Sequence, residues 1–194
     1  MRIGLFFGSF NPPHVGHTVI AEYALHAMDA DEVWMVVSPQ NPFKELRDLL
    51  PEEDRLELVQ LAIQGFERIK ASDVEFDMPR PSYTIDTIDR LKQAHPETEF
   101  FLILGSDNIP GLPGWKEYDR LLEECPIAVY PRKGHEFKES GDSGSIQSID
   151  APLIELSSTY IRDALSSEKP CQAMMRDSVY QHILDGGFYS SASS

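Results

Sequence analysis

The segment Gly8–His17, which reads Gly-Ser-Phe-Asn-Pro-Pro-His-Val-Gly-His, holds the residues of this chain best suited to chemistry. Its glycine and proline turn presents backbone N–H groups, and the helix expected to follow adds the positive end of its dipole. His14 and His17 stand three residues apart, so both project from one side of the first helical turn. This combination predicts a site that holds phosphate.

Two other interpretations fit the histidine pair. Zinc needs three or four ligands, and its helical protease signature, His-Glu-x-x-His, is absent here. A pair of helix-capping surface histidines would need no ligand at all. The position directly after Pro12 and Pro13 favours an anion site over both. The chain lacks the P-loop and the Gly-x-Gly-x-x-Gly fingerprint, so the segment matches neither common nucleotide signature.

Three later residues are candidates for the same site. Asp107, expected just past a strand end, can accept hydrogen bonds from ribose hydroxyls or cap a helix. Trp115 can stack on a flat ring or pack in the core. Arg162 follows Ser157, Ser158 and Thr159 at a helix start, where a cation opposes the dipole and so indicates a nearby anion.

Two more segments carry weaker signals. The helix start at Ser82, Tyr83 and Thr84 offers N–H groups to a carboxylate or phosphate, but ordinary capping by Ser82 or Thr84 is the favoured interpretation from the local sequence. Lys44 lies in a proline-rich loop on the side of the sheet where ligands are expected, and alone it would read as an ordinary exposed lysine.

Strand-like and helix-like patterns alternate along the chain and should position these residues. Strands are expected at Arg2–Phe7, Glu32–Ser38, within Ile69–Phe76, at Phe100–Leu104, at Ile127–Tyr130 and near Leu153–Leu156. One helix is expected to begin after residue 13 and to continue to about residue 28. Others are expected to begin at Pro51, at Ser82 or Thr84 and at about Ser158, and two more to lie around Trp115–Leu122 and at Asp177–Leu184.

Repeated strand-helix units without hairpin signals predict an α/β, Rossmann-like fold with a mostly parallel sheet and helices on both faces. We expect a single domain over residues 1–189, with a flexible surface excursion at 133–150 and a disordered tail at 190–194. Ligands of such folds bind beyond the carboxyl ends of the strands, and the candidate segments all fall there.

Composition narrows the function classes. The chain has 194 residues, 41% hydrophobic and 25% charged, as in an ordinary globular protein. A net charge of −15 argues against non-specific nucleic-acid binding. No apolar run approaches the roughly 20 residues of a membrane span, and no leader-like segment precedes the first strand. We therefore expect a cytoplasmic protein, with Cys125 and Cys171 as free thiols that serve packing.

In these motifs the chain resembles bacterial nicotinate-nucleotide adenylyltransferases of the HxGH nucleotidyltransferase superfamily. Five segments match the family in order over nearly the whole chain: Gly8–His17, Pro39–Lys44, Pro81–Thr84, Gly105–Asp107 with Pro113–Trp115, and Leu156–Arg162. Three positions depart from the family pattern. Phe7 replaces a glycine beside the phosphate turn, Phe43 replaces a frequent histidine, and Leu156 replaces an isoleucine.

The resemblance implies transfer of AMP from ATP to nicotinic acid mononucleotide, with Mg²⁺ carried by ATP rather than by a cage of protein ligands. It implies catalytic roles for His14, His17, Lys44 and Arg162. It assigns ATP binding to Gly8, Ser9, Phe10, His14, His17, Gly105, Asp107, Ser158, Thr159 and Arg162. It assigns mononucleotide binding to Ser9, Asn41, Lys44, Tyr83, Thr84 and Trp115, the last by stacking on the pyridine ring.

The chemistry of the reaction agrees with these residue types. The second pKa of a phosphomonoester is about 6, so the attacking oxygen is already anionic near neutral pH and needs no general base. The reaction needs in-line positioning and neutralisation of phosphate charge, and no covalent nucleophile.

Three rival functions are less well matched. A phosphopantetheine adenylyltransferase would carry threonine at His14, a cytidylyltransferase would end with a different closing motif, and a nucleotide sensor would have lost a phosphate-site group. The sequence leaves open the degree of preference for nicotinate over nicotinamide mononucleotide and whether the chain forms a homo-oligomer.

Overall fold

The strands of this chain form one sheet. The computed structural model describes residues 1–39, 49–137 and 145–190. The strands are β1 (Arg2–Gly8), β2 (Glu32–Val37), β3 (Ile69–Ser72), β4 (Glu99–Gly105), β5 (Ile127–Tyr130) and β6 (Ile146–Ser148). Their order is β3-β2-β1-β4-β5-β6, and every adjacent pair is parallel. The predicted fold class, a Rossmann-like parallel sheet in a single domain, is confirmed.

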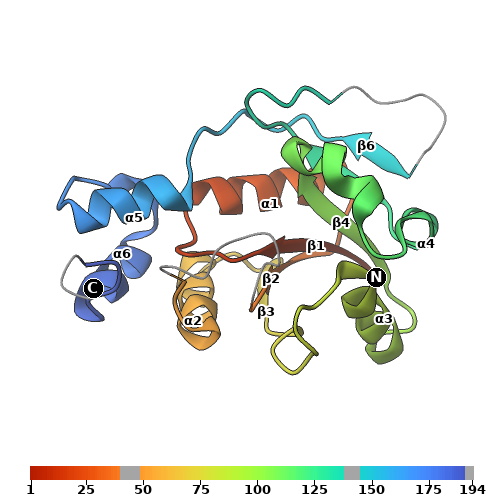
Figure 1. The fold of residues 1–194 in the computed structure, drawn as a ribbon, viewed down its shortest axis with the longest axis horizontal. Helices are drawn as coiled ribbons and strands as arrows, with labels where there is room; N and C mark the ends of the chain where they lie inside the picture. Colours follow the sequence, from red (N-terminus) through yellow and green to blue (C-terminus); the bar gives the residue numbers. More distant parts are fainter. Residues whose placement is uncertain (40–48, 138–144, 191–194) are drawn as a thin grey trace.

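Helices connect the strands and cover the sheet. The α-helices are α1 (Val15–Ala27), α2 (Glu52–Ala62), α3 (Thr84–Ala94), α4 (Tyr118–Glu124), α5 (Ser158–Ser166) and α6 (Asp177–Asp185). Two 3₁₀-helices are η1 (Ser106–Gly114) and η2 (Gln172–Met174). Helix α1 runs along one side of the sheet and α3 lies on the other, while α5 and α6 gather beside α2 near the C-terminus (Figure 1).

Apolar packing on both faces explains why the central strands read as continuous hydrophobic runs. One buried cluster joins α1 to side chains of β1, β2 and β4, including Phe6 and Phe101. A second joins α3 and α4 to the opposite face through Ile88 and Leu121. A third holds α2, α5 and α6 together around residues such as Leu58. The helices that carry the candidate residues are therefore held at defined places around the sheet.

The sheet order places a topological switch point between β1 and β4. From β1 the chain first builds outward through β2 and β3, and it then returns to place β4 on the other side. Loops at such a point diverge and leave a crevice at the carboxyl ends of the strands. Gly8 ends β1 and Gly105 ends β4, so both predicted loops open at that crevice.

The structure corrects the position of the last strand. The prediction of a strand near Leu153–Leu156 is wrong. The edge strand is β6, which lies inside the segment 133–150 predicted as a surface excursion. Pro152 has no backbone N–H for a ladder, and Leu153 is 53% exposed. The edge strand has only three residues and a polar pattern, which explains why its sequence carries little signal.

Two helix starts also differ from expectation. The helix predicted around Trp115 begins at Tyr118, because the preceding residues with Pro110 and Pro113 form η1. Helix α3 is preceded by Tyr83 as its N-cap residue, and no side chain caps it, so capping by Ser82 or Thr84 is wrong. This helix end therefore has backbone N–H groups that no side chain cap satisfies.

Candidate active site

Residues 8–14, from the last residue of β1 to the residue before α1, form the phosphate loop. Phe10 turns it with a left-handed backbone, φ 45°. The buried Phe10 ring lies edge-on to Phe6 at 5.9 Å and to His17 at 5.0 Å between centroids. A bulky residue keeps a positive φ only where its surroundings hold it there. The aromatic packing under the loop therefore sets the course of its backbone.

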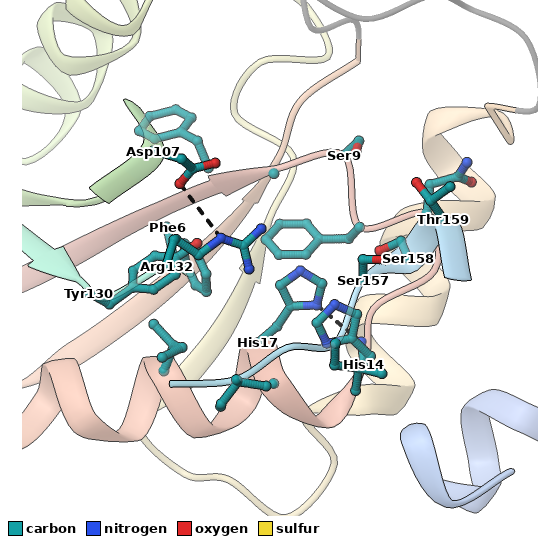
Figure 2. Close-up of a pocket in the computed structure, with 18 of the residues that line it drawn as sticks. Phe6, Ser9, His14, His17, Asp107, Tyr130, Arg132, Ser157, Ser158 and Thr159 are labelled. Atoms are coloured by element: carbon teal, nitrogen blue, oxygen red, sulfur yellow. Dashed lines mark hydrogen bonds and ion pairs between the residues drawn. The ribbon is translucent and has the colours of Figure 1, made fainter. Parts of the chain in front are cut away.

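The two histidines lie stacked at the start of α1, with ring centroids 3.7 Å apart (Figure 2). The His14 backbone N–H donates to Nδ1 of His17 over 3.1 Å. Because Nδ1 accepts this bond, the proton of the neutral His17 ring resides on Nε2. The local geometry therefore makes His17 Nε2 a hydrogen-bond donor without any change of protonation.

His14 is nearly buried, with 6% of its surface exposed. Burial, followed by the positive charge of Arg132, lowers the pKa of His14 from 6.5 to about 4. Its Nδ1 has no hydrogen-bond partner among the described residues. His14 is therefore a neutral ring at neutral pH in the folded protein.

We expect this histidine to make stability fall in mild acid. The unfolded chain takes up a proton at His14 below about pH 6.5, whereas the folded chain resists it until about pH 4. Stability from this residue is complete above pH 6.5 and is lost as pH falls toward 4. Between about pH 7.5 and about pH 5 the loss should be about 2 kcal/mol.

Urea unfolding at these two pH values checks this expectation. A His14→Gln variant should lose less stability over the interval than the wild type. A His26→Gln variant, changed at an exposed position of α1, should keep the wild-type dependence. If His14→Gln and the wild type lose the same unfolding free energy between the two pH values, the expectation is contradicted.

The start of α5 is attached to the phosphate loop. Ser157 caps α5 by accepting the Tyr160 N–H, and the Ser158 hydroxyl donates to the Pro12 carbonyl over 2.8 Å. Arg162 donates from Nη1 to the Asn11 carbonyl, also over 2.8 Å. The residues that join the first and last predicted segments are therefore in direct contact, although about 150 positions separate them in the chain.

Arg132 reaches toward the histidines from just past the end of β5 (Figure 2). Its backbone N–H donates to Ser106 Oγ over 2.9 Å, and its Nε lies 3.6 Å from Asp107 Oδ1. Its guanidinium carbon stands 5.9 Å from the centroid of the Tyr130 ring. This arginine adds a positive charge to the site that sequence reasoning did not include.

Two cavities open at the carboxyl ends of the strands. The histidine pocket, of about 430 Å³, is lined by His14, His17, Arg132 and Arg162 among others. The tryptophan pocket, of about 390 Å³, is lined by Tyr83, Thr84 and Trp115 among others. Both volumes suit a small ligand. The pockets share one wall, formed by Phe6, Phe7, Gly8, Ser9, Asn108 and Tyr130.

The tryptophan pocket lies between the start of α3 and the residue that follows η1. Half-buried Trp115 packs against the second apolar cluster, and Tyr83 is exposed. The ammonium of Lys116 lies 5.2 Å from the Tyr83 ring centroid. An aromatic side chain and an uncapped helix start thus border the same cavity. This arrangement suits a flat ring that carries a carboxylate.

Arg55 of α2 supports the loops from below. Its side chain is fully buried, with 0% exposed. It donates to the carbonyls of Ser9 and Ser38 at 2.8 Å, of Leu50 at 2.9 Å and of Pro39 at 3.0 Å. Burial lowers the pKa of Arg55. One buried guanidinium therefore ties the phosphate loop to both described ends of the loop between β2 and α2.

The structure brings most predicted site residues together. The histidine pocket is lined by Gly8, Ser9, Phe10, His14, His17, Asp107, Ser158, Thr159 and Arg162. The tryptophan pocket is lined by Ser9, Tyr83, Thr84 and Trp115, and also by Gly105, which was expected beside adenosine. Phe7 lines both pockets. Asn41, Phe43 and Lys44 lie outside the described residues.

Sequence reasoning missed Arg55 and Arg132. Arg132 carried a usable signal, because a cation two residues past a predicted strand lies at the ligand side of the sheet. Arg55 carried none, since an arginine within an amphipathic helix ordinarily faces solvent. Only its tertiary contacts reveal its place beneath the loops.

Two further observations concern metals and membranes. Residues 1–39, 49–137 and 145–190 contain no group of three or more histidine, cysteine, aspartate or glutamate side chains that could hold a metal ion. In that same part of the chain, no helix has the length and apolar character to cross a membrane.

Comparison with known proteins gives consistent matches. A family model described as cytidylyltransferase-like matches residues 5–164. A Bacteroides fragilis protein, named a probable nicotinate-nucleotide adenylyltransferase, is 48% identical over 183 residues, covering 94% of this chain and 91% of the relative. A Flavobacterium johnsoniae protein of the same name is 43% identical over 191 residues, covering 97% and 99% of the two chains.

Solved structures share the fold. The Plasmodium falciparum nicotinic acid mononucleotide adenylyltransferase, in its complex with NaAD, superposes with a TM-score of 0.81 and 21% identity and covers 97% of both chains. The same enzyme in complex with APC gives the same TM-score and identity, with 97% and 96% of the chains covered.

Proposed function

Because the chain belongs to the cytidylyltransferase-like family and, within it, to the nicotinate-nucleotide adenylyltransferases, we propose that it transfers AMP from ATP to nicotinic acid mononucleotide. The products are nicotinic acid adenine dinucleotide and pyrophosphate, and the reaction belongs to NAD biosynthesis. The protein is thus a nucleotidyltransferase, and the two pockets are its substrate sites.

The observation that carries this proposal is the wall shared by the two pockets. Gly8 and Ser9 of the phosphate loop border both cavities. A transfer between two phosphates needs the reacting groups on either side of one short stretch of backbone. A ligand in each pocket would place its phosphate against this stretch. The arrangement suits joining of two nucleotides better than binding of one.

We assign ATP to the histidine pocket. Hydrogen-bond donors in this pocket come from His17 Nε2 and from the guanidinium groups of Arg162 and Arg132. The starts of α1 and α5 add positive potential. His14 also lines this pocket, and its neutral ring carries one N–H that can donate a hydrogen bond. Neutral rings donate hydrogen bonds without the cost of burying another charge.

The reaction then proceeds without a protein nucleophile. A phosphate oxygen of the mononucleotide attacks the α-phosphorus of ATP and forms a new P–O bond. The bond from the α-phosphorus to the bridging oxygen breaks, and pyrophosphate leaves with that electron pair. Since the attacking oxygen is anionic above its pKa of about 6, no proton needs removal. Donors placed in advance stabilise the charge that develops on the phosphates.

We assign the mononucleotide to the tryptophan pocket. Trp115 would stack on the pyridine ring, and the N–H groups at the uncapped start of α3 would receive the nicotinate carboxylate. Asn41 and Lys44 remain proposed contacts to this substrate on the strength of the family motif alone.

We propose that Mg²⁺ enters with ATP, held by phosphate oxygens and water. Mg²⁺ prefers oxygen ligands and keeps several waters, and among the described residues that line the histidine pocket Asp107 is the one carboxylate. When bound, the ion would neutralise phosphate charge. We also propose a cytoplasmic location, in keeping with two buried cysteines that are free thiols.

One assay tests the proposed function. Purified protein is incubated with ATP and Mg²⁺, and pyrophosphate release is measured with nicotinic acid mononucleotide, with its amide, or with phosphopantetheine. We expect release with the acid and none above background with phosphopantetheine. No release with either mononucleotide would overturn the proposal, and release with phosphopantetheine would point to the sister enzyme.

The same assay measures the preference for the acid. We expect kcat/KM for nicotinic acid mononucleotide to exceed that for the amide by about tenfold or more, because a carboxylate gains more from an uncapped helix start than a neutral carboxamide does. Similar kcat/KM values for the two substrates would count against this placement of the carboxylate.

A further inference from the structure

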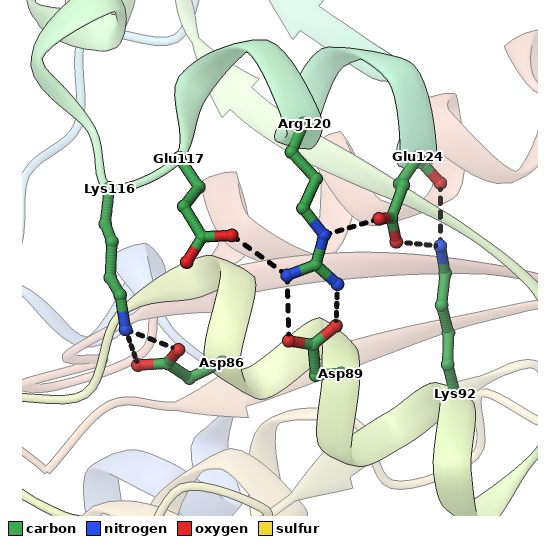
Figure 3. Close-up of polar contacts among 7 residues, drawn as sticks. All are labelled: Asp86, Asp89, Lys92, Lys116, Glu117, Arg120 and Glu124. Carbon is green, nitrogen blue, oxygen red and sulfur yellow. Dashed lines mark hydrogen bonds and ion pairs between the residues drawn. The ribbon is translucent and has the colours of Figure 1, made fainter.

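Helices α3 and α4 face each other with complementary rows of charge (Figure 3). The α3 row consists of Asp86, Asp89 and Lys92, spaced three residues apart. The opposite row consists of Lys116, Glu117, Arg120 and Glu124, in and just before α4. The two rows together are called the α3–α4 bridge below.

The contacts of the bridge follow the rows in order. Lys116 Nζ donates to both carboxylate oxygens of Asp86, at 2.7 and 2.9 Å. The Arg120 guanidinium forks onto Asp89, with Nη1 at 3.1 Å from Oδ2 and Nη2 bonded to Oδ1. It also donates to Glu117 at 3.0 Å and to Glu124 at 2.5 Å. At the other end of the rows, Lys92 Nζ donates to Glu124 Oε2 over 2.9 Å.

The order of the charges specifies one register between the two segments. A slip by one turn in one direction would place Asp89 opposite Glu124, and a slip in the other would place Lys92 opposite Arg120. Each alternative gives one like-charge pair and one opposite-charge pair, whereas the observed register gives three opposite-charge pairs. Apolar packing through Ile88 and Leu121 is less directional. The charge pattern therefore selects the relative position of these elements.

Residues next to both charge rows line the tryptophan pocket. One wall of the pocket is the start of α3, two to three residues before Asp86. A second part of the wall is Trp115 with Lys116, the first residue of the opposite charge row. We propose that the α3–α4 bridge, centred on Arg120, positions these two walls and so sets the affinity for the mononucleotide. This inference rests on the proposed function for the identity of the ligand.

The bridge also affects the ionisation of its members. Hydrogen bonding to Asp86 raises the pKa of Lys116, and hydrogen bonding to Asp89 raises that of Arg120. Hydrogen bonding to Lys92 lowers the pKa of Glu124. Single exposed ion pairs contribute little, but a forked arginine within a network has defined geometry. Arg120 lines neither pocket among the described residues, so it acts through position and not through contact with substrate.

The test replaces Arg120 with methionine, which keeps much of the length and removes the fork. We expect KM for nicotinic acid mononucleotide to rise about five- to tenfold, with kcat and KM for ATP within about twofold of the wild type. The matched control is Arg90→Met on α3, where the exposed arginine has one ion-pair partner among the described residues, Asp77 at 3.8 Å. This control should leave all three constants unchanged.

A second readout does not depend on turnover. Hydrogen exchange should be faster at residues 83–88 and 112–118 in Arg120→Met than in Arg90→Met. A mononucleotide KM that stays at the wild-type value, or that rises together with the KM for ATP, would overturn the inference, as would unchanged exchange. Failure of the wild type to join ATP and the mononucleotide would instead refute the proposed function, and the exchange result would still decide the role of the bridge.

Reversing the pair distinguishes register from a general loss of stability. Arg120→Asp alone places a fourth acid beside Asp89, Glu117 and Glu124, and it should raise the mononucleotide KM more than Arg120→Met does. Adding Asp89→Arg restores opposite charges across the bridge and should recover most of the increase. A double variant as impaired as Arg120→Asp would exclude a role for this pair in setting the register.

Discussion

Replacing His17 with alanine is expected to lower kcat for dinucleotide formation by about 100- to 1,000-fold. The reason is the loss of a donor whose direction is determined by the backbone, since His17 Nδ1 accepts the His14 N–H and the ring proton is left on Nε2. Such a donor costs no reorganisation when charge develops on the phosphates. Steady-state kinetics with saturating ATP and nicotinic acid mononucleotide measure the change.

The fold should survive this substitution. The His17 ring stacks on His14 and meets Phe10 edge-on, contacts worth about 1–2 kcal/mol together. The matched control is His26→Ala, on the exposed face of the same helix, which should keep wild-type kcat. A folded His17→Ala enzyme with a near-normal rate of pyrophosphate release would remove His17 from the mechanism. So would an equal loss of rate in the His26→Ala control.

Replacing Arg55 with methionine is expected to give the largest loss of stability among these substitutions. It leaves four carbonyls without this donor, that of Pro39 in a buried place and those of Ser9, Ser38 and Leu50 in partly buried ones. Unsatisfied buried acceptors cost about 1–3 kcal/mol each when water cannot reach them. With some relaxation, we expect the free energy of unfolding to fall by about 3 kcal/mol or more, and Tm by about 6–12 °C.

Activity should fall as well, because Ser9 belongs to the wall that both pockets share. Measured at a temperature where the variant is still folded, kcat should fall by about tenfold or more, since the phosphate loop loses a fixed anchor. Calorimetry and kinetics on Arg55→Met and Arg90→Met provide the comparison. A Tm within about 2 °C of the wild type would show that the four bonds contribute little.

Local residue types were enough to predict the strand, turn and helix start that form the phosphate loop. A strand, a glycine and proline turn, and a helix start form within about fifteen neighbouring residues, so no distant contact is needed to recognise them. The same holds for the parallel sheet, because buried strands alternate with amphipathic helices along the chain. The edge strand β6 escaped prediction because three half-exposed residues carry almost no pattern.

Other features depend on contacts between residues far apart in the chain. The uncapped start of α3 was not recognisable locally, because Ser82 and Thr84 are good capping residues that the fold leaves one position away from the N-cap. The bridge between α3 and α4 joins Asp89 to Arg120, and its pattern means nothing until the two helices are placed side by side.

The sequence by itself determined the family and the fold class, and it singled out His14 and His17 as candidates, since each of these rests on short segments with a local pattern. Tertiary structure alone decided that one loop borders two pockets and that Arg55 lies beneath the loops. The physical reason is that burial, desolvation and complementary charge arise only when distant segments pack together, and no local spacing records which segments will meet.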